Sequence, residues 1–338
     1  MFDVICVGSS TVDVFAKTKY SELIKIMDNN NKEEDLLAYP VGGKILINEL
    51  DFTTGGGGTN VAVSLSKLGL KAAYLGCMGK GGNSEIVLGA LKKFKVDSSL
   101  VVRKKGDTGY SIILDSIEHD RTILAYKGLN NELDFKDIKK DKLKTKWFYF
   151  SAMLNKAFKT QEKIAKFAEK NKIKIAFNPS SYLAERGSHF LKNIISRTEI
   201  LVLNKEEAAL IVGKDSIEYL AKKLYQLGPN YVVITDGRKG AYCYHDGFLY
   251  FAKTNNIPIV ETTGAGDAFA SAFLAGIILM NRKGRKNNAV EFALKLATTN
   301  AESVISYHGA KNKLLALKEA EYILSRKRQI KVSRKKLN

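Results

Sequence analysis

The sequence has few cysteines and no long apolar run, and these two absences exclude several classes of protein. Its 338 residues include only Cys6, Cys77 and Cys243, which are far apart and follow no CxxC spacing. This argues against a disulfide framework or a zinc site, so we interpret the thiols as reduced and structural. No run approaches the roughly 18 apolar residues of a membrane span, and MFDVICVGSS lacks the features of a signal peptide. We therefore expect a cytoplasmic protein with no membrane span.

Acidic residues are scarce relative to basic ones. The chain has 54 Lys and Arg against 35 Asp and Glu, which gives a net charge of +19 at pH 7. Such a balance favours association with polyanions such as RNA, or with anionic substrates such as nucleotides. No aromatic-studded RNA-binding motif accompanies the charge, so nucleic-acid binding is not expected as the main function. The stretch RKRQIKVSRKKLN, residues 326–338, has seven basic residues and no acid, and we expect it to be a disordered tail.

The order of segments along the chain predicts an α/β fold. With 45% hydrophobic and 26% charged residues, the chain can bury a substantial core. It opens with the nearly continuous apolar run FDVICVG, residues 2–8, which predicts a strand buried on both faces. Helix-period and strand-like segments then alternate through most of the chain. Such alternation builds βαβ units, so we expect a mostly parallel sheet with helices on both faces.

Two segments interrupt this alternation. Residues 14–51 contain strand-like pieces around the polar stretch MDNNNKEED, and residues 109–128, GYSIILDSIEHDRTILAYKG, read as a hairpin with alternating apolar residues. We expect them to form a small antiparallel layer outside the main sheet. Long excursions from an α/β core are often lids or binding loops, although a simple extension of the sheet edge is the alternative.

A glycine-rich stretch is the first candidate for ligand binding, because open parallel sheets bind ligands at their strand-to-helix turns. In GGGGTNVAVSLSKLG, the glycines Gly55 to Gly58 precede Asn60 at the start of an apolar-periodic helix. Glycines let the backbone approach a ligand closely, and Asn60 either caps the helix or binds a ligand hydroxyl group. Taken alone, the stretch is equally explained by a flexible turn followed by a helix cap.

A second stretch, ETTGAGDAFASAFLAG, places Gly264, Ala265 and Gly266 immediately before Asp267. We expect a helix to begin near Asp267, with free backbone N–H groups and the helix dipole directed at an anion such as a phosphoryl group. Asp267 is either a carboxylate that stabilises the helix N-terminus or a general base that takes a proton from a substrate hydroxyl group. From this stretch alone both roles stay open.

Two further stretches follow buried strands. In NKEEAALIVG, Asn204 and Glu207 are explained locally as a helix cap and its partner. The alternative is that they organise the Mg²⁺ of a nucleotide, which few carboxylates hold and which keeps several waters. In VVITDGRKGAYCY, Thr235, Gly237 and Gly240 form a turn that either runs along a phosphate chain or only joins two strands.

In this order and at these separations, the four stretches resemble the ribokinase family, also called the PfkB carbohydrate kinases. The most specific is ETTGAGD, which matches the family's D-T-x-G-A-G-D signature at six of seven positions. The first glycine-rich stretch resembles another family signature, and NKEE resembles the N-x-x-E motif. The resemblance runs from residue 2 to about residue 315. It implies a three-layer α/β/α kinase domain over residues 1–325, with lid segments at about 14–51 and 107–128.

The resemblance also implies the activity and its residues. The expected reaction is ATP-dependent, Mg²⁺-assisted phosphoryl transfer to a hydroxyl group of a ribose- or fructose-like sugar, with Asp267 as the base and the backbone around it holding the phosphoryl group. The residues that match the family's transfer site are Gly264, Ala265, Gly266 and Asp267. Those implied to bind the sugar are Asp13, Gly56, Gly57 and Asn60. Those implied to bind the nucleotide are Asn204, Glu207, Thr235, Gly237, Gly240, Asn300 and Ser303, with Glu207 reaching Mg²⁺ through water. The resemblance also implies a homodimer formed through the lid.

Some residues depart from the family pattern. Glu261 replaces an Asp that helps ligate a monovalent cation in relatives, so a potassium requirement stays open, and Asn178 stands where many members have Asp. The substrate also stays open, because a nucleoside offers the same hydroxyl groups as a sugar. A phosphosugar would need a cation, which Lys44, Arg121 or Lys127 in the lid segments would supply. A kinase-like protein that binds a ligand or RNA without chemistry is the alternative from another class.

Overall fold

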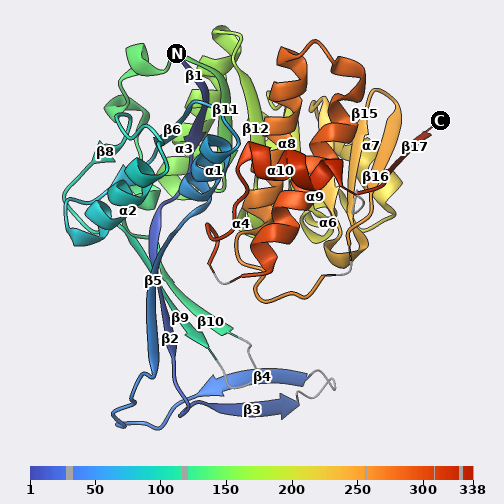
Figure 1. Ribbon diagram of the computed structural model, residues 1–338. Helices are drawn as coiled ribbons and strands as arrows, with labels where there is room; N and C mark the ends of the chain where they lie inside the picture. The colour runs from blue at the N-terminus through green and yellow to red at the C-terminus, as the bar shows by residue number, and fades with distance from the viewer. Residues whose placement is uncertain (28–32, 116–120, 256, 308, 327–329, 338) are drawn as a thin grey trace.

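A nine-stranded sheet forms the centre of the molecule. The computed structural model describes residues 1–27, 33–115, 121–255, 257–307, 309–326 and 330–337 (Figure 1). Within them the strands of this sheet are, in spatial order, β17 (Val332–Lys336), β16 (Phe248–Ala252), β15 (Ala241–His245), β14 (Tyr231–Thr235), β13 (Ile200–Asn204), β12 (Lys174–Asn178), β11 (Thr145–Ser151), β1 (Phe2–Val7) and β6 (Ala72–Leu75). The six strands from β14 to β6 are parallel to one another. Each of β15, β16 and β17 pairs antiparallel with the strand before it, beginning with β15 on β14.

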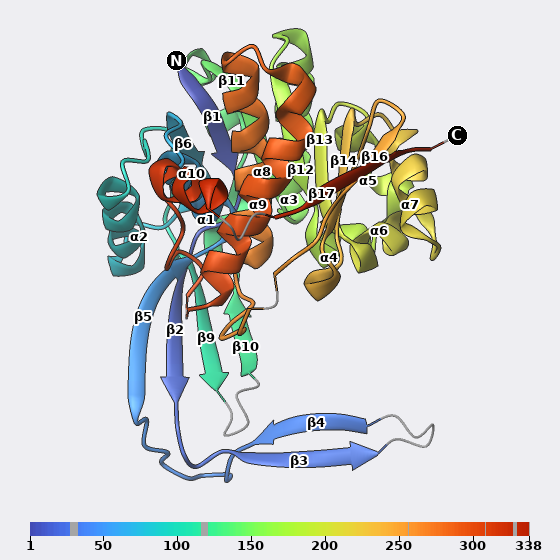
Figure 2. The same ribbon diagram turned by 45° about the vertical axis from the view of Figure 1, so that its right-hand side comes forward.

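Helices cover both faces of this sheet (Figure 2). One face is covered by α1 (Gly57–Lys67), α2 (Gly82–Lys93), α8 (Ala265–Arg282), α9 (Ala289–Ile305) and α10 (Leu317–Ser325). The other face is covered by α3 (Asn155–Lys170), α4 (Ser180–Ala184), α5 (Gly187–Ile195), α6 (Lys205–Val212) and α7 (Ile217–Tyr225). The predicted three-layer α/β/α architecture, with a mostly parallel sheet, is therefore confirmed.

Strand β1 shows why the sheet needs both helical layers. Successive side chains of a strand point to opposite faces. Val4 and Cys6 belong to the core under the first layer, whereas Ile5 and Val7 belong to the core under the second, and none of the four is exposed. The continuous apolar run at the start of the sequence is thus the signature of a strand with both faces buried.

A second sheet of four strands projects from the α/β body (Figure 1). In spatial order it consists of β10 (Arg121–Tyr126), β9 (Gly109–Asp115), β2 (Thr11–Lys17) and β5 (Glu49–Gly55). We call this sheet the lid. Beyond its far end lies a ribbon of two antiparallel strands, β3 (Glu22–Met27) and β4 (Glu33–Ala38). The expectation of an antiparallel layer is wrong for one pair, because β2 and β9 are parallel. Both strands leave the body in the same direction, so they cannot pair antiparallel.

The expectation of a disordered tail over residues 326–338 is also wrong for residues 332–336. They form β17, which pairs antiparallel with β16. Without β17, the backbone groups along one side of β16 would form an open sheet edge. The charges of the added strand find partners, since the Lys335 ammonium group lies 2.6 Å from a Glu218 carboxylate oxygen and Arg334 lies over the ring of Phe248.

None of the helices in the described part of the chain is long and apolar enough to cross a bilayer.

Candidate active site

Asp267 lies at the N-terminus of α8, where the helix meets the glycine-rich turn before α1. The helix begins at Ala265, two residues earlier than expected, and Gly264 is its cap residue. The Asp267 side chain accepts a hydrogen bond of 2.9 Å from Nδ2 of Asn60. Burial raises the pKa of the Asp267 carboxyl group, while the hydrogen bond from Asn60 and the positive charge of Lys311 lower it.

The backbone around Asp267 has the shape that an anion site requires. Gly264 has a φ of 80°, in the left-handed region that glycine adopts easily. The amide of Ala265 donates to the carbonyl of Thr262 at 3.2 Å. Within the described residues, no backbone acceptor bonds the amides of Gly266 and Asp267. These two N–H groups therefore remain available for an anion at the positive end of the helix dipole.

Four residues are predicted to bind a sugar. Asn60 and Gly57 lie beside Asp267, whereas Asp13 and Gly56 lie at the root of the lid. Asn60 is 5% exposed, and its Oδ1 has no hydrogen-bond partner among the described residues. A buried acceptor without a partner is typical of a site that is completed by a ligand or water. Gly57 must be glycine, because a Cβ atom there would lie 2.9 Å from Cβ of Ser151 and 3.4 Å from Oδ1 of Asp267. Gly56 precedes α1, and Asp13 lies in β2 opposite Thr53 of β5.

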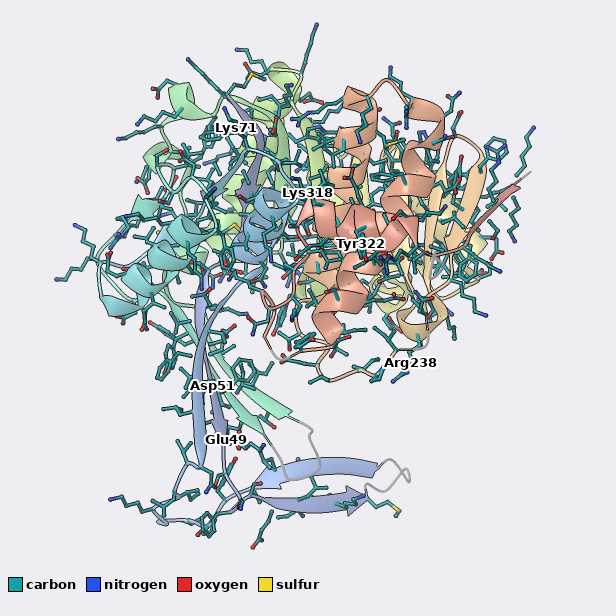
Figure 3. The ribbon with its side chains drawn as sticks, viewed as in Figure 1. Glu49, Asp51, Lys71, Arg238, Lys318 and Tyr322 are labelled. Carbon is teal, nitrogen blue, oxygen red and sulfur yellow. The ribbon has the colours of Figure 1, made fainter. Side chains whose placement is uncertain are left out.

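A pocket of about 330 Å³ lies on the other side of the α8 N-terminus. It brings together five residues predicted at the sequence level, namely Thr235, Gly237, Gly240, Ala265 and Gly266. Its lining also includes Arg238, from the short 3₁₀ helix η4 (Gly237–Lys239), and Asn255, neither of which we had predicted. Arg238 lies at the edge of the α/β body on the side from which the lid projects (Figure 3). The pocket therefore has a cation near its entrance and apolar side chains such as Phe269 within.

Asn300 and Ser303, which the resemblance implies to bind the nucleotide, are not among the lining residues of this pocket, although their helix borders it. Helix α9 contributes Thr298, Ala301, Glu302 and Ile305, at the spacing of a single helix face. Asn300 lies on another face, where its Nδ2 donates to the carbonyl of Ala268 at 2.9 Å and its Oδ1 accepts from the amide of Leu315 at 3.0 Å. The Ser303 hydroxyl group donates to the carbonyl of Lys313 at 2.8 Å. Both residues therefore fix the loop after α9.

Asn204 and Glu207 form a capping box at the start of α6. Oδ1 of Asn204 accepts from the amide of Glu207 at 2.7 Å, and Oε2 of Glu207 accepts from the amide of Asn204 at 3.0 Å. This capping box does not exclude a second role, because Asn204 is the direct neighbour of the pocket residue Thr235 across the sheet. Glu207 is 7% exposed, and burial raises the pKa of its carboxyl group. The described residues contain no cluster of three or more His, Cys, Asp or Glu that would hold a metal alone.

Lys311 is a residue of the site that the sequence patterns did not reveal. It lies in the loop between α9 and α10, and its side chain is buried beside the glycine-rich turn. Its Nζ donates to the Thr54 carbonyl at 2.6 Å and to the Thr59 hydroxyl group at 3.0 Å. Burial lowers the pKa of this amine to about 7, while the negative charges of Asp13 and Asp267 act in the opposite direction. No motif signals this position, since a lysine near the end of a basic chain is unremarkable by itself.

Glu261 and Asn178, which depart from the family pattern, both form hydrogen bonds with the backbone. Glu261 is buried, and its Oε2 accepts from the amide of Gly309 at 2.8 Å. Nδ2 of Asn178 donates to the carbonyl of Val202 at 2.7 Å. These contacts do not test a potassium requirement, which stays a prediction.

The lysines and the arginine considered as partners for a phosphosugar lie in different places. Lys127, at the root of the lid, lies over the ring of Tyr182 at 5.2 Å and lines a small pocket with Ser9. Lys44 is exposed on the segment that joins β4 to β5. The side chain of Arg121 lies outside the described part of the structure.

The chain was compared with known protein families. The model of the pfkB family carbohydrate kinases matches residues 3–317. Among curated proteins, an uncharacterized sugar kinase of Archaeoglobus fulgidus is 25% identical over 75% of this chain and 98% of its own length. A 5-dehydro-2-deoxygluconokinase of Bacillus licheniformis is 23% identical over 96% of each chain.

Solved structures share the fold. A provisionally named ribokinase II from E. coli, solved in complex with ATP and Mg²⁺, has a TM-score of 0.79 and 17% sequence identity. The similarity covers 96% of this chain and 99% of that one.

Proposed function

The chain belongs to the pfkB family of carbohydrate kinases, and from this premise we propose that it transfers the γ-phosphoryl group of ATP, with Mg²⁺, to a hydroxyl group of a ribose- or fructose-like sugar. Membership makes it a transferase that acts on hydroxyl groups. The donor, the metal ion and the kind of sugar are the parts that the proposal adds.

One observation carries the proposal. Ala265 and Gly266 line the large pocket, whereas the next residue, Asp267, is hydrogen-bonded to Asn60 on the other side of the helix start. The N-terminus of α8 therefore separates a pocket large enough for a nucleotide from a set of polar groups suited to a sugar. A phosphoryl group that passes from the first site to the second must pass this helix N-terminus.

Asp267 acts in this proposal as the general base. Its carboxylate accepts the proton of the attacking hydroxyl group, while the amides of Gly266 and Asp267 stabilise the negative charge of the phosphoryl group in transit. Asn60 keeps the carboxylate in place through its hydrogen bond and offers its unpartnered Oδ1 to another hydroxyl group of the sugar. Most of the rate enhancement then comes from positioning and charge stabilisation, as is general for phosphoryl transfer.

The pocket residues fit a nucleotide with bound magnesium. The turn with Thr235, Gly237 and Gly240 presents backbone to a phosphate chain, and Arg238 supplies a positive charge. Mg²⁺ typically keeps several waters and binds few carboxylates, so the absence of a ligand cluster from the described residues is compatible with a metal held by the phosphates and, through water, by Glu207. The E. coli structure in complex with ATP and Mg²⁺ supports both the nucleotide and the metal ion of this proposal.

A specific observation favours a second candidate, a sugar that carries an anionic group. Lys127 lines a small pocket with Ser9 and Asn131 at the ends of strands that lead to the active site. In the described part of the chain, no salt-bridge partner lies within 4.0 Å of its ammonium group. An anionic substituent, such as the phosphate of a phosphosugar or the carboxylate of a sugar acid, would complete this pocket. The name of the B. licheniformis relative, a gluconate derivative kinase, is compatible with such a substrate.

The test is ADP release from Mg²⁺-ATP with a panel of pentoses, hexoses, nucleosides, phosphosugars and sugar acids. The Asp267→Asn variant, which keeps the side-chain shape but cannot act as a base, is assayed in parallel. We expect turnover with a sugar and a loss of about 10² to 10⁴ in kcat in the variant. Turnover only with nucleosides would replace the proposed substrate class. Folded protein without turnover on any compound would favour the alternative of ligand or RNA binding without chemistry.

The lid supports the further proposal of a homodimer. Exposed apolar side chains, among them Leu50, Phe52 and Leu124, lie along its two edge strands. A patch of this kind on a projecting sheet is typical of an association surface. A second copy of the chain is the proposed partner.

A further inference from the structure

Lys311 is a buried cation within the wall of the active site. Its side chain is 9% exposed. The Nζ atom donates hydrogen bonds of 2.6 Å to the Thr54 carbonyl, 3.1 Å to the Thr54 hydroxyl group and 3.0 Å to the Thr59 hydroxyl group. An ammonium group has three donors, so these contacts fully occupy it.

The two threonines connect the lid to the catalytic centre. Thr54 belongs to β5, at the root of the lid, and directly precedes the glycine turn. Thr59 belongs to α1 and donates its own hydroxyl proton to the carbonyl of Gly55 at 2.6 Å. The residue after Thr59 is Asn60, which holds Asp267. Lys311 thus contacts the lid directly, at Thr54, and contacts Thr59, the residue next to Asn60.

The charge of Lys311 is not neutralised by a direct ion pair. Among the described residues, no carboxylate lies within the 4.0 Å of a salt bridge from its ammonium group. The negative groups that act on it from neighbouring elements are Asp13 of β2 and Asp267 of α8. Burying a charge that no carboxylate pairs directly costs free energy, even where hydrogen bonds offset part of the cost. This cost is explained if the positive charge stabilises the ionised carboxylates of Asp13 and Asp267.

We propose that Lys311 is a positioning residue of the phosphoryl-transfer centre: its ammonium group holds the root of the lid against α1 and supplies the positive charge that keeps the buried Asp267 carboxyl group ionised. The inference rests on the proposed role of Asp267 as the base. Tyr149 of β11 is the other titratable group that interacts with Asp267, and burial together with that carboxylate raises the pKa of its hydroxyl group. Tyr149 is therefore neutral and adds no second negative charge beside Asp267.

The pH dependence of kcat separates this role from a purely structural one. The amine of Lys311, with a pKa of about 7, is mostly protonated below that pH. Loss of the nearby positive charge makes a carboxylate harder to form. We therefore expect Lys311→Met to move the acidic limb of the kcat profile upward by about one pH unit, as is usual for loss of a neighbouring charge. A residue that only braces the loop would lower kcat at every pH without moving the limb.

The experiment compares four variants at saturating sugar and Mg²⁺-ATP. Lys311→Met and Lys311→Gln both remove the charge, and the glutamine variant keeps an N–H donor in case the methionine variant does not fold. Lys311→Arg retains the charge, and its limb should return toward the wild-type position. Lys313→Met is the matched control, because Lys313 is exposed in the same loop and lies over the ring of Tyr307. This control should keep the wild-type profile.

The outcomes distinguish this inference from the proposed function. If the charge-removing variants fold and keep the acidic limb in its wild-type place, Lys311 does not set the ionisation of the base and the inference is overturned. If Asp267→Asn retains wild-type turnover, the assignment of the base fails, whatever the Lys311 variants do. If Asp267→Asn is inactive and the limb shifts only in Lys311→Met and Lys311→Gln, both assignments stand.

Discussion

Glu207 shows how one side chain can serve the fold and the chemistry together. One oxygen of its carboxylate accepts from the amide of Asn204, which closes the capping box at the start of α6. Burial raises the pKa of the carboxyl group, because it disfavours the charged form. A divalent cation would reverse this tendency. Substitution of Glu207 therefore tests the proposed Mg²⁺ site independently of the role of Asp267.

The first prediction concerns Glu207→Gln. Glutamine keeps a side-chain oxygen for the capping hydrogen bond but carries no charge, so the fold should persist while Mg²⁺ is held less well. We expect the Mg²⁺ concentration for half-maximal activity to rise by about 10- to 100-fold, the usual effect of losing an outer-shell metal partner. Titration of activity with Mg²⁺ at fixed ATP measures it. Glu206→Gln is the control, because Glu206 is exposed; an unchanged requirement in Glu207→Gln would remove this residue from the metal site.

The sequence predicted individual site residues where the backbone is unusual and missed those that depend on tertiary contacts. Asp267 and the glycines before it stand out because glycine and a carboxylate at a helix start have few structural explanations. Lys311 does not stand out, because its partner Thr54 is 257 residues away in the chain. The contacts of Asn300 outside the pocket lining could not be predicted for a related reason. The sequence gives the period of α9, but only the packed neighbours decide which of its faces meets the pocket.

The start of α8 depends on a turn that only glycine can form. The backbone of Gly264 is in the left-handed region, and a Cβ atom there would lie 2.5 Å from Cβ of Ala310. The glycine thus allows two segments to approach closely, the start of α8 and the loop that carries Lys311. The geometry of the anion site and the position of the buried cation therefore depend on the same residue.

The second prediction compares two Gly→Ala variants. Gly264→Ala should destabilise the protein, because a left-handed conformation costs an L-residue about 1–2 kcal/mol and the clash with Ala310 adds to this. Gly89→Ala should stabilise it by about 0.5–1 kcal/mol, since Gly89 lies within α2 with open space around it. Thermal unfolding measures both. A melting temperature for Gly264→Ala at or above the wild-type value would contradict the argument, and Gly89→Ala shows that the assay detects an increase.

Elements with a strong hydrophobic period were predictable, whereas those defined by their neighbours were not. β1 is recognised from its apolar run because both of its faces are buried. β17, with the sequence VSRKK, carries too little apolar surface to indicate a strand, and it forms because β16 offers an open edge. The parallel pairing of β2 with β9 is likewise set by the direction in which both strands leave the body.

The shape of the whole molecule follows from an α/β body with one projecting sheet. The alternation of segments predicted the body and its three layers, and the interruptions predicted that something lies outside it. The sequence did not indicate that the lid ends in a further ribbon, β3 and β4, well away from the body (Figure 2). A sheet that extends so far into solvent needs further contacts to stay ordered. The distribution of its apolar side chains indicates a surface for such contacts.

The two faces of the lid differ in chemistry. Residues paired across neighbouring strands point to the same face. The register places Phe52, Val14, Ile112 and Leu124 in one row across all four strands. The adjacent row on the opposite face contains Thr53, Asp13, Ser111 and Ala125, and the row beyond it on that face contains Asp51, Phe15, Ile113 and Ile123. The face of Asp13 therefore carries both polar and apolar residues. Glu49 and Asp51, which lie along the lid in Figure 3, also belong to the face of Asp13.

The third prediction follows from the apolar face. Phe52 is 59% exposed and Leu124 is 54% exposed, a costly arrangement in water unless a second surface covers it. We expect the wild-type protein to sediment as a dimer, and Phe52→Lys, which places a charge at the β5 end of the apolar row, to shift it toward monomer. Sedimentation velocity over a range of protein concentrations measures both. Leu210→Lys is the control, since Leu210 is 47% exposed on α6, which packs with α4, α5 and α7 in the α/β body, and should leave the dimer intact. A wild-type monomer at every accessible concentration would end the proposal, and a Phe52→Lys protein that remains dimeric would move the interface away from the lid.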